Sequence, residues 1–247
     1  MATPVKIYQQ EMHDNVGFFA TWLPGDRLEI GDIGVFQDGR FRKQSSLSEL
    51  GIEATVSAKG SSQNLQYTST SGTSIHMGAS GAVPNAPGVS AEIKLEFSKD
   101  GAFLFNASKV RDERIENRSV LTRAILDAYD RREWKKEWYL IEAVHSADCA
   151  TIIVSEDSSA GLVLSASADL SLGTIPLADP QVRLSVNSTR GRMVQVIAER
   201  NLRPLYSCLR LKDPWFSEPS VVPVRGVGRE SGELLFARPS IGELLNS

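Results

Sequence analysis

The side chains most able to do chemistry in this sequence are three histidines and two cysteines, and most of them lie far apart along the chain. The nearest pair is His145 and Cys149, which fall in a stretch that we expect to be extended. Residues four apart in a strand are roughly 13 Å apart along one face, which is too far to share a metal ion. Cys149 and Cys208 are too few for a disulfide framework, so they form either one bridge or, as we favour, two ordinary buried thiols. We therefore expect no metal site and no cofactor.

Two local patterns look like ligand-binding motifs, but each has a simpler explanation. Residues 78–82 are rich in glycine, yet they lack the lysine and the following helix that a phosphate-binding loop needs. Asp26, Asp32 and Asp38 are evenly spaced, but they occupy turn positions beside glycine, where aspartate is common without any ligand. None of the many serines sits in a Gly-x-Ser-x-Gly elbow. We expect a protein that is not an enzyme; catalytic residues gathered from distant positions are the alternative.

The charge balance argues against a nucleic-acid partner. The formal net charge is −3, whereas a nucleic-acid binder would show a basic stripe. The first residues lack the apolar core of a signal peptide, and no window approaches the ~18 uncharged apolar residues of a transmembrane helix. We therefore expect a protein that is cytoplasmic at rest and that meets a membrane only through strands, a surface helix or a conformational change.

Alternating side chains predict that strands dominate the fold. The cleanest alternation covers residues 89–98, whose apolar side chains point one way and whose polar side chains point the other. Residues 160–169 alternate in the same manner, and Asp38-Gly39 between two apolar runs predicts a two-residue hairpin. Further strands are expected at 103–110, 138–145, 150–155, 161–168, 182–187, 193–198 and 205–211.

Helical spacing is strongest at residues 118–132, and a shorter stripe at 4–13 is compatible with one or two helical turns. Many strands with few helices predict an α+β fold. The chain divides into a main domain (1–212), a linker rich in proline and glycine (213–229) and an apolar tail (230–247). The apolar side chains of this tail are Leu234, Leu235, Phe236, Ile241, Leu244 and Leu245.

A cluster of cations follows the helix predicted at 118–132. Arg131, Arg132, Lys135 and Lys136 surround Trp134. Cations interleaved with an aromatic residue are typical of proteins that meet an acidic lipid surface. They are equally typical of a solvated helix end, where positive charge offsets the helix dipole. Both interpretations stay open at this point.

The order of elements is itself informative. A short N-terminal helix and a β segment precede extended strands rich in serine, threonine and glycine, and then a phenylalanine-rich strand with Phe97, Phe103 and Phe105. Residues 110–115, a helix and the aromatic-initiated strand at 138–144 follow, and Arg203-Pro204-Leu205-Tyr206 comes late in the domain. Over residues 1–212 this order resembles the gasdermin pore-forming domain, especially that of the compact bacterial gasdermins.

The resemblance implies a twisted, mainly antiparallel central sheet with long hairpins and a few short peripheral helices, as in the gasdermin N-terminal domain. It implies an autoinhibited effector of cell death or defence that is a monomer at rest. An activating protease would remove residues 230–247, with Arg225 and Arg229 as candidate cleavage sites. The freed domain would bind membrane lipids, with Arg131, Arg132, Lys135 and Lys136 as the candidate lipid-facing basic residues. It would then assemble into a large homo-oligomeric β-barrel in the inner or plasma membrane.

Two hairpin regions, 64–98 and 147–169, are the expected membrane-inserting segments. Strands of a membrane barrel need about 9–11 residues that alternate between apolar and polar side chains. The expected membrane-facing residues are Leu65, Tyr67, Ile75, Met77, Ile93, Leu95, Phe97, Ile152, Val154, Leu162 and Leu164. The same alternation also packs one face of a water-soluble sheet on helices. The alternative is therefore a non-lytic protein-interaction or adaptor domain whose tail is structural.

Overall fold

The computed structural model describes residues 3–23, 25–79, 90–167, 177–179, 181–212 and 235–245. Strands make up 51% and helices 16%, and the strands are mainly antiparallel, which confirms the predicted α+β class. The chain forms two compact units. Unit 1 comprises Met1–Arg27, Lys59–Asp112 and His145–Leu205, and unit 2 comprises Leu28–Ala58, Glu113–Val144 and Tyr206–Ser247. Strands β8 and β11 contribute residues to both units.

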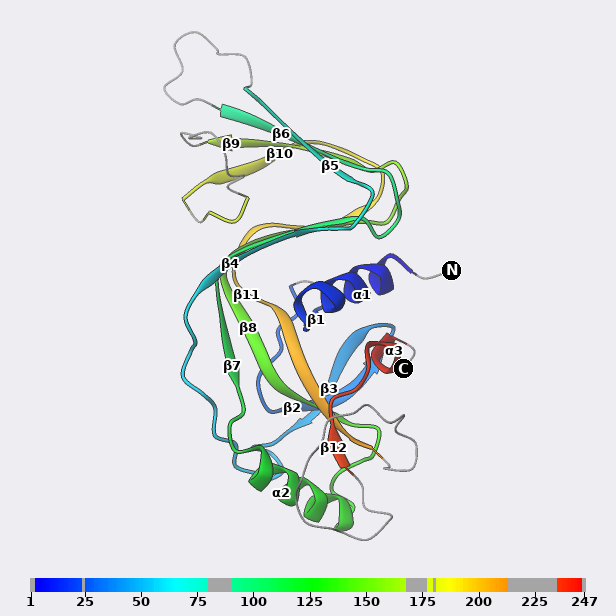
Figure 1. The fold of residues 1–247 in the computed structure, drawn as a ribbon, viewed down its shortest axis with the longest axis vertical. Coiled ribbons are helices and arrows are strands. Elements are labelled where there is room, and N and C mark those ends of the chain that lie inside the picture. Colours follow the sequence, from blue (N-terminus) through cyan, green and yellow to red (C-terminus); the bar gives the residue numbers. More distant parts are fainter. Residues whose placement is uncertain are drawn as a thin grey trace. The chain divides into compact units, whose positions relative to one another are not determined.

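The helices and strands are labelled in Figure 1. In chain order they are α1 (Pro4–Val16), β1 (Phe19–Ala20), β2 (Asp32–Gln37), β3 (Arg40–Ser46), β4 (Gln63–Thr68), β5 (Thr73–Ala79), β6 (Ser90–Phe97), β7 (Phe103–Arg114), α2 (Arg118–Asp130), β8 (Tyr139–Ser155), β9 (Gly161–Ser167), β10 (Arg183–Arg190), β11 (Met193–Lys212), β12 (Leu235–Ala237) and α3 (Ile241–Leu245).

Unit 1 contains two sheets and one helix in three layers. Its large sheet has the strand order β1-β11-β8-β7-β4, and its small sheet has the order β10-β9-β6-β5. Helix α1 packs on one face of the large sheet and the small sheet packs on the other (Figure 1). The strands of the large sheet therefore have apolar neighbours on both faces, which is why β7 is buried throughout Phe103–Ala107 and β8 throughout Cys149–Ser155.

Helix α1 is fixed at both ends by local chemistry. The Thr3 hydroxyl accepts a hydrogen bond from the Lys6 N–H at 3.4 Å, and Pro4 occupies the first helical position. At the other end Gly17 adopts a left-handed conformation with φ of 73° and donates its N–H to the His13 carbonyl. The face between these caps buries Tyr8 and Met12.

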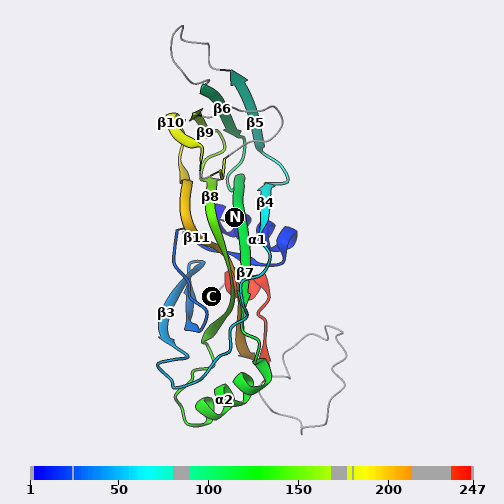
Figure 2. The ribbon, with the colours of Figure 1, turned by 90° about the vertical axis from the view of Figure 1, so that its left-hand side faces the viewer.

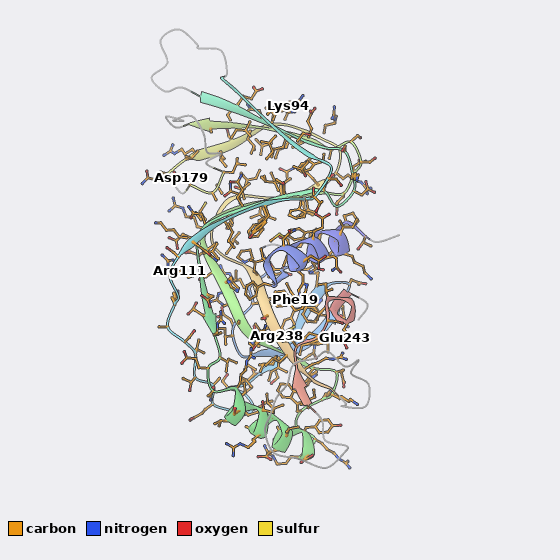
Figure 3. The ribbon with its side chains drawn as sticks, in the orientation of Figure 1. Phe19, Lys94, Arg111, Asp179, Arg238 and Glu243 are labelled. Atoms are coloured by element: carbon orange, nitrogen blue, oxygen red, sulfur yellow. The ribbon has the colours of Figure 1, made fainter. Side chains whose placement is uncertain are left out.

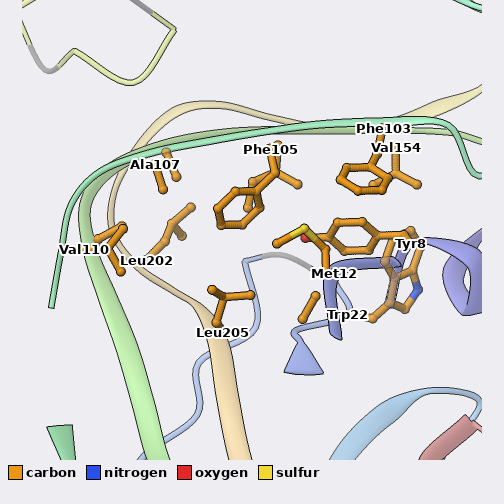
Figure 4. Packing of buried hydrophobic residues seen from close by; sticks show 14 residues of the cluster. Tyr8, Met12, Trp22, Phe103, Phe105, Ala107, Val110, Val154, Leu202 and Leu205 are labelled. Atoms are coloured by element: carbon orange, nitrogen blue, oxygen red, sulfur yellow. The ribbon is translucent and has the colours of Figure 1, made fainter. Parts of the chain in front are cut away.

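The first core of unit 1 lies between α1 and the large sheet (Figure 4). The Tyr8 ring meets Phe103 edge-on with ring centroids 5.1 Å apart, and it lies 6.2 Å from Trp22. The buried members of the first core are Tyr8, Met12, Ala20, Trp22, Phe103, Phe105, Ala107, Val110, Ala147, Ala150, Ile152, Val154, Leu202 and Leu205.

The second core of unit 1 lies between the large sheet and the small sheet. On β7, Leu104 belongs to this core whereas its neighbours Phe103 and Phe105 belong to the first, as strand alternation requires. The buried members of the second core are Ile93, Leu95, Phe97, Ala102, Leu104, Ile153, Ala160, Leu162, Leu164, Ala166, Leu177 and Val182.

Unit 2 packs α2 and the β2–β3 hairpin around a third core. Strand β2 pairs with β3 on one side and with β8 on the other, and β12 pairs with β11. The hairpin predicted at Asp38-Gly39 is confirmed, since both residues have positive φ, 52° and 73°, as a two-residue turn of this kind needs. The buried members of the third core are Ile33, Leu47, Ile52, Ile115, Leu121, Ile125, Ala128, Trp134, Leu140 and Leu211.

Two pairs of predicted strands are in fact single long strands. The segments expected at 138–145 and 150–155 merge into β8, because Ala147 and Cys149 stay buried while Asp148 pairs with Arg111 of β7 at 2.8 Å. The segments expected at 193–198 and 205–211 merge into β11, where left-handed backbone at Ala198 and Asn201 carries the strand through its charged middle. Among the described residues, no helix is long and apolar enough to cross a membrane.

Tyr8 provides a test of the first core. Its ring is buried, and its hydroxyl has no hydrogen-bond partner among the described residues. We expect Tyr8→Phe to raise the free energy of unfolding by about 1–3 kcal/mol, because it removes an unsatisfied buried group. Urea denaturation measures the change, with Tyr67→Phe as the control on a half-buried tyrosine that packs against the same core.

The same substitution should also change stability at alkaline pH. Burial raises the pKa of Tyr8 far above its ordinary value. The unfolded chain therefore releases this proton first, and the protein loses stability as the pH rises above the unfolded pKa of about 10. This loss of stability at alkaline pH should be smaller in Tyr8→Phe than in the unsubstituted protein. If both proteins lose the same stability as the pH rises, burial does not raise the pKa of Tyr8.

Candidate functional site

The small sheet joins the two predicted hairpin regions into one antiparallel ribbon. Strand β5 pairs with β6 from Thr73↔Phe97 to Ala79↔Ala91. Strand β9 pairs with β10, and β6 pairs with β9 from Ser90↔Ser167 to Glu96↔Gly161. Both hairpins therefore point the same way, and their central strands hold each other through a full ladder of backbone hydrogen bonds.

The register of this ribbon places apolar residues opposite one another in rows. One row contains Ile75, Leu95 and Leu162, and the next contains Ile93, Leu164 and Val186 together with the backbone position of Met77. Side chains in one row share a face of the sheet. This apolar face is the one that the second core covers, except that Val186 on the outer strand β10 is 45% exposed.

The opposite face of the small sheet is polar. Lys94 points away from the second core (Figure 3) and its Nζ lies 2.9 Å from a Glu96 carboxylate oxygen. This hydrogen bond from Lys94 lowers the pKa of Glu96. His76 lies 3.7 Å from the same carboxylate, and the Asn187 amide donates to the Ser165 hydroxyl. The ribbon thus has one apolar and one charged face across four strands, a pattern that a membrane barrel and a soluble sheet share.

Each strand of the small sheet continues, through a short turn, into a strand of the large sheet. The turn at 69–72 joins β4 to β5, and 98–102 joins β6 to β7. The turn at 156–160 joins β8 to β9, and 191–192 joins β10 to β11. The order β11-β8-β7-β4 in the large sheet matches the order β10-β9-β6-β5 in the small sheet (Figure 2). The small sheet is therefore the same set of strands folded back over itself.

We name these four turns (69–72, 98–102, 156–160 and 191–192) the hinge line. Backbone hydrogen bonds run across the hinge line. Ser98 donates its N–H to the Gly72 carbonyl at 2.8 Å, Gly101 to the carbonyl of Ser155, the residue just before the third turn, at 2.8 Å, and Glu156 to the Arg192 carbonyl at 2.9 Å. Three of the four turns contain a glycine with positive φ, namely Gly72, Gly101 and Gly191. Left-handed glycine is what allows the chain to reverse in so few residues.

The structure brings only part of the predicted membrane-facing set together. Ile93, Leu95, Phe97, Leu162 and Leu164 are buried on the apolar face of the small sheet, and Ile75 is half-buried beside them. Met77 lies at its register position in β5, and its side chain is outside the described part of the structure.

The remaining four residues of that set lie elsewhere. Leu65 and Tyr67 belong to β4, which pairs with β7, and they pack against the first core. Ile152 and Val154 of β8 are also in the first core. The hairpin expected within 147–169, in which 147–155 would pair with 160–169, was wrong, because β9 pairs with β10 and β6. Alternation shows which side chains share a face, but not which strand lies next to another.

Thr151 is a residue of this site that was not predicted from the sequence. It is fully buried in β8, its hydroxyl donates to the Leu177 carbonyl, and it accepts the Ala198 N–H at 2.9 Å. Leu177 belongs to the connection between β9 and β10, so this hydroxyl ties that hairpin to the large sheet. The signal in the sequence was a single threonine within an apolar run, where valine would otherwise be expected.

The C-terminal tail docks within unit 2. Strand β12 extends β11 by pairing Ala237 with Arg210 and Leu235 with Lys212. After it, Pro239 is buried, and helix α3 buries Leu244 and half-buries Ile241. Phe236 is in β12 and Leu245 in α3, but their side chains, like that of Leu235, are outside the described part of the structure. Arg225, Arg229 and Leu234 lie outside the described residues.

A buried carboxylate anchors this tail. The Glu142 side chain is 1% exposed and bonds to two arginines, Arg118 of α2 and Arg238 of the tail, the latter at 2.8 Å. A second ion pair joins Arg210 of β11 to Glu243 of α3 at 3.0 Å. A buried charge is tolerable only while it is paired, so Glu142 makes the fold of unit 2 depend on these arginines.

The predicted basic cluster is more constrained than the sequence indicated. Trp134 is buried in the third core, so it cannot also be an aromatic anchor at a lipid surface. Arg131 is paired with Glu133 at 2.8 Å, which raises the pKa of Arg131. Lys135 lies over the Trp138 ring at 5.5 Å. Arg132 and Lys136 are exposed.

The chemistry of the remaining candidates is limited. Cys149 and Cys208 are both free and buried, so the alternative of a bridge between them is not what the structure has. Burial raises the pKa of both thiols. Within the described ranges, no group of three or more histidine, cysteine, aspartate or glutamate side chains could hold a metal ion. No family model and no curated protein matches the sequence.

Gly191 tests the geometry of the hinge line. Its φ is 73°, and a Cβ there would lie 2.9 Å from the Ala160 Cα. Gly17 has the same φ of 73° with nothing within 4 Å of such a Cβ. We expect Gly17→Ala to cost about 1–2 kcal/mol through left-handed strain alone, and Gly191→Ala to cost clearly more because backbone atoms must also move. Equal shifts of the urea midpoint in the two variants would mean that the turn at 191–192 is not tightly packed.

Proposed function

We propose that this protein is a gasdermin-like pore former whose small sheet unfolds at the hinge line to build a membrane-spanning β-barrel. The observation that carries the proposal is the shared strand order of the two sheets in unit 1. Straightening the four turns would convert eight paired segments into four long antiparallel strands. Neighbouring strands keep their neighbours, so the sheet need not be rebuilt.

Strand length supports this mechanism. In the small sheet β5 and β9 have 7 residues each and β6 and β10 have 8 each, fewer than the roughly 9–11 that a membrane strand needs. Their continuations β4, β7, β8 and β11 have 6, 12, 17 and 20 residues. A straightened strand therefore has ample length to cross the hydrocarbon layer and remain anchored outside it.

Backbone pairing supports an oligomer rather than an inserted monomer. Unpaired backbone groups are too costly inside a bilayer, so strands cross only as a closed barrel. Strands β5 and β10 are the outer strands of the small sheet, and within the described part of the chain each has a neighbour on one side only. In a ring, β10 of one copy would pair with β5 of the next, which is why the proposed partners are membrane lipids and further copies of this chain.

The apolar face explains why the change would wait for a membrane. Exposing a fully buried leucine or isoleucine to water costs about 1.5–3 kcal/mol. Ile93, Leu95, Leu162 and Leu164 are all buried on this face. Lipid acyl chains can replace the second core as their cover, whereas water cannot.

The tail is the proposed inhibitory element, released by a protease that cuts in the linker. It adds β12 to β11, the strand that continues through 191–192 into the small sheet. Removing one partner of a fully buried ion pair costs roughly 3–5 kcal/mol. The loss here would be smaller, because the Arg238 side chain is 52% exposed and Glu142 keeps Arg118.

Truncation after Arg229 tests the inhibitory role of the tail. We expect the truncated protein, and not the full chain, to release a trapped dye from vesicles that contain phosphatidylserine or cardiolipin. A synthetic peptide of residues 230–247 added in trans should suppress the release, since it can reoccupy the edge of β11.

Two outcomes would contradict the proposal. One is a truncated protein that keeps its far-UV circular dichroism spectrum and releases no dye. The other is a truncated protein that unfolds, which would favour the non-lytic adaptor domain, because β12, Leu244 and the Arg238–Glu142 pair would then be needed for folding itself.

Val186 tests the lipid-facing side of the ribbon without disturbing the soluble fold. It shares a row with Leu164 but is 45% exposed, so an aspartate is tolerated there in water. We expect Val186→Asp to reduce dye release at least tenfold in the truncated protein. Each copy in a ring would place a charge against lipid, at a cost somewhat below the roughly 2–4 kcal/mol of a lysine or arginine at the midplane.

Ser185→Asp is the matched control for this variant. Ser185 is the exposed neighbour on the polar face of the same strand, so release should be nearly unchanged. If both aspartates reduce release equally, the two faces of the ribbon do not differ in the membrane.

A further inference from the structure

Helix α1 contacts two of the four turns of the hinge line. One Glu11 carboxylate oxygen accepts the backbone N–H of Thr70 at 2.8 Å and the Thr70 hydroxyl at 3.2 Å. Both bonds go to a charged acceptor, the stronger kind of hydrogen bond in proteins. The turn at 69–72, which joins β4 to β5, is therefore held from outside the sheet by a helix residue.

The second contact is a packing contact at the next turn. Ile7 lies directly over Gly101, and a Cβ on Gly101 would come 2.7 Å from the Ile7 Cβ. Gly101 thus serves two purposes, since its φ of 77° makes the turn at 98–102 and its missing side chain lets the helix approach. Tyr8 extends this contact to Phe103, the first residue of β7.

The two contacts share one property. Both are made to the chain as it is reversed at 69–72 and at 98–102, so straightening β4–β5 or β6–β7 would have to break or rearrange them. Ser98, in the second turn, is bonded to Gly72 in the first, so the two turns behave as one structural unit.

We propose that α1 is a lock on the hinge line, by which we mean that its contacts hold the four turns in their folded-back form. Glu11 positions the turn at 69–72, and Ile7 covers the turn at 98–102. This inference rests on the proposed function and adds a second level of control to it. The tail belongs to unit 2, whereas α1 and the hinge line belong to unit 1. Removal of the tail would therefore be necessary but not sufficient, and α1 must also leave the two turns.

The first experiment uses the full chain in solution and no membrane. Hydrogen exchange of Glu11→Ala is compared with that of Asp14→Ala, a second acidic residue of α1 whose carboxylate bonds to the Gln10 side chain instead. We expect the Thr70 amide to exchange about tenfold faster or more in Glu11→Ala. The amides of Gly101 and Glu156, which bond across the hinge line, should exchange faster to a similar degree. Asp14→Ala should leave these amides unchanged.

This comparison separates a lock from a local contact. Faster exchange at Thr70 alone would overturn the proposal, because Glu11 would then stabilise only its own turn. Glu156 lies in the turn that joins β8 to β9, which Glu11 does not contact. Its amide should exchange faster only if Glu11 stabilises the whole hinge line and not just the turn at 69–72.

The second experiment cross-links α1 to the hinge line. Disulfides need Cβ atoms about 3.5–4.5 Å apart, so Ile7→Cys with Gly101→Cys requires a shift of roughly 1 Å. The matched control is Gly72→Cys with Lys99→Cys, where a Cβ on Gly72 lies 3.1 Å from the Lys99 Cβ and both residues are in turns that stay neighbours after straightening. The native Cys149 and Cys208 are buried.

Each pair is made in the full chain, with a specific protease site added in the linker so that the tail is cut on demand. After cleavage we expect the oxidised Ile7–Gly101 pair to release less than a tenth of the dye that its reduced form releases. The oxidised Gly72–Lys99 pair should release as much dye as its reduced form.

The outcomes for the lock and for the pore are distinguishable. Full release from the oxidised Ile7–Gly101 protein would overturn the lock and leave the pore intact. No release from any cleaved protein would overturn the proposed pore, while the exchange experiment still decides whether α1 holds the hinge line together.

Discussion

The two-sided burial of β7 and β8 is the constraint on which the rest of unit 1 depends. Their side chains alternate between two cores, so Phe103 and Phe105 face α1 while Leu104 and Ile153 face the small sheet. A strand that is apolar on both faces is stable in water only when both faces are covered. Helix α1 covers one face. The small sheet covers the other, and because its strands are continuations of the large sheet, it does so only by folding back at the hinge line.

This constraint also explains how the apolar face of the small sheet stays covered in water. Opening the hinge line would uncover the apolar face of the small sheet and, at the same time, the Leu104 and Ile153 side of the large sheet. Both losses are hydrophobic, and the hydrophobic effect is non-directional, so any apolar medium can replace the lost cover. The polar face, with its Lys94–Glu96 pair, needs water in either state. The soluble and the proposed membrane forms thus differ in what covers one face, while the pairing of strands stays the same.

The sequence predicts which side chains share a face of a strand better than it predicts which strands pair with one another. Alternation at 89–98 and the Asp38-Gly39 turn are confirmed, because each depends on residues next to one another in the chain. The pairing of β9 with β10 and β6 was missed, since partner choice depends on how the whole chain closes. Glu142 illustrates a second limit. It looks like the polar face of a strand, yet it is buried, because two arginines 24 and 96 residues away neutralise it. No local pattern contains that information.

In the proposed opening, the backbone changes would lie in the turns, while the strand pairing within each sheet would be kept. The β5–β6, β6–β9 and β9–β10 ladders can persist, so no register must be found again. What must change is the backbone of four short turns and the few bonds between them. Glycine adopts left-handed and extended conformations at little cost, so Gly72, Gly101 and Gly191 allow the chain to reverse and also allow the reversal to be undone. Turns that are intrinsically reversible must be held by contacts from outside the sheet. Helix α1 occupies that position at 69–72 and 98–102, and the Thr151 hydroxyl does so for the hairpin of β9 and β10. The folded-back form is therefore held both by burial of the second core and by these few polar and packing contacts at the turns.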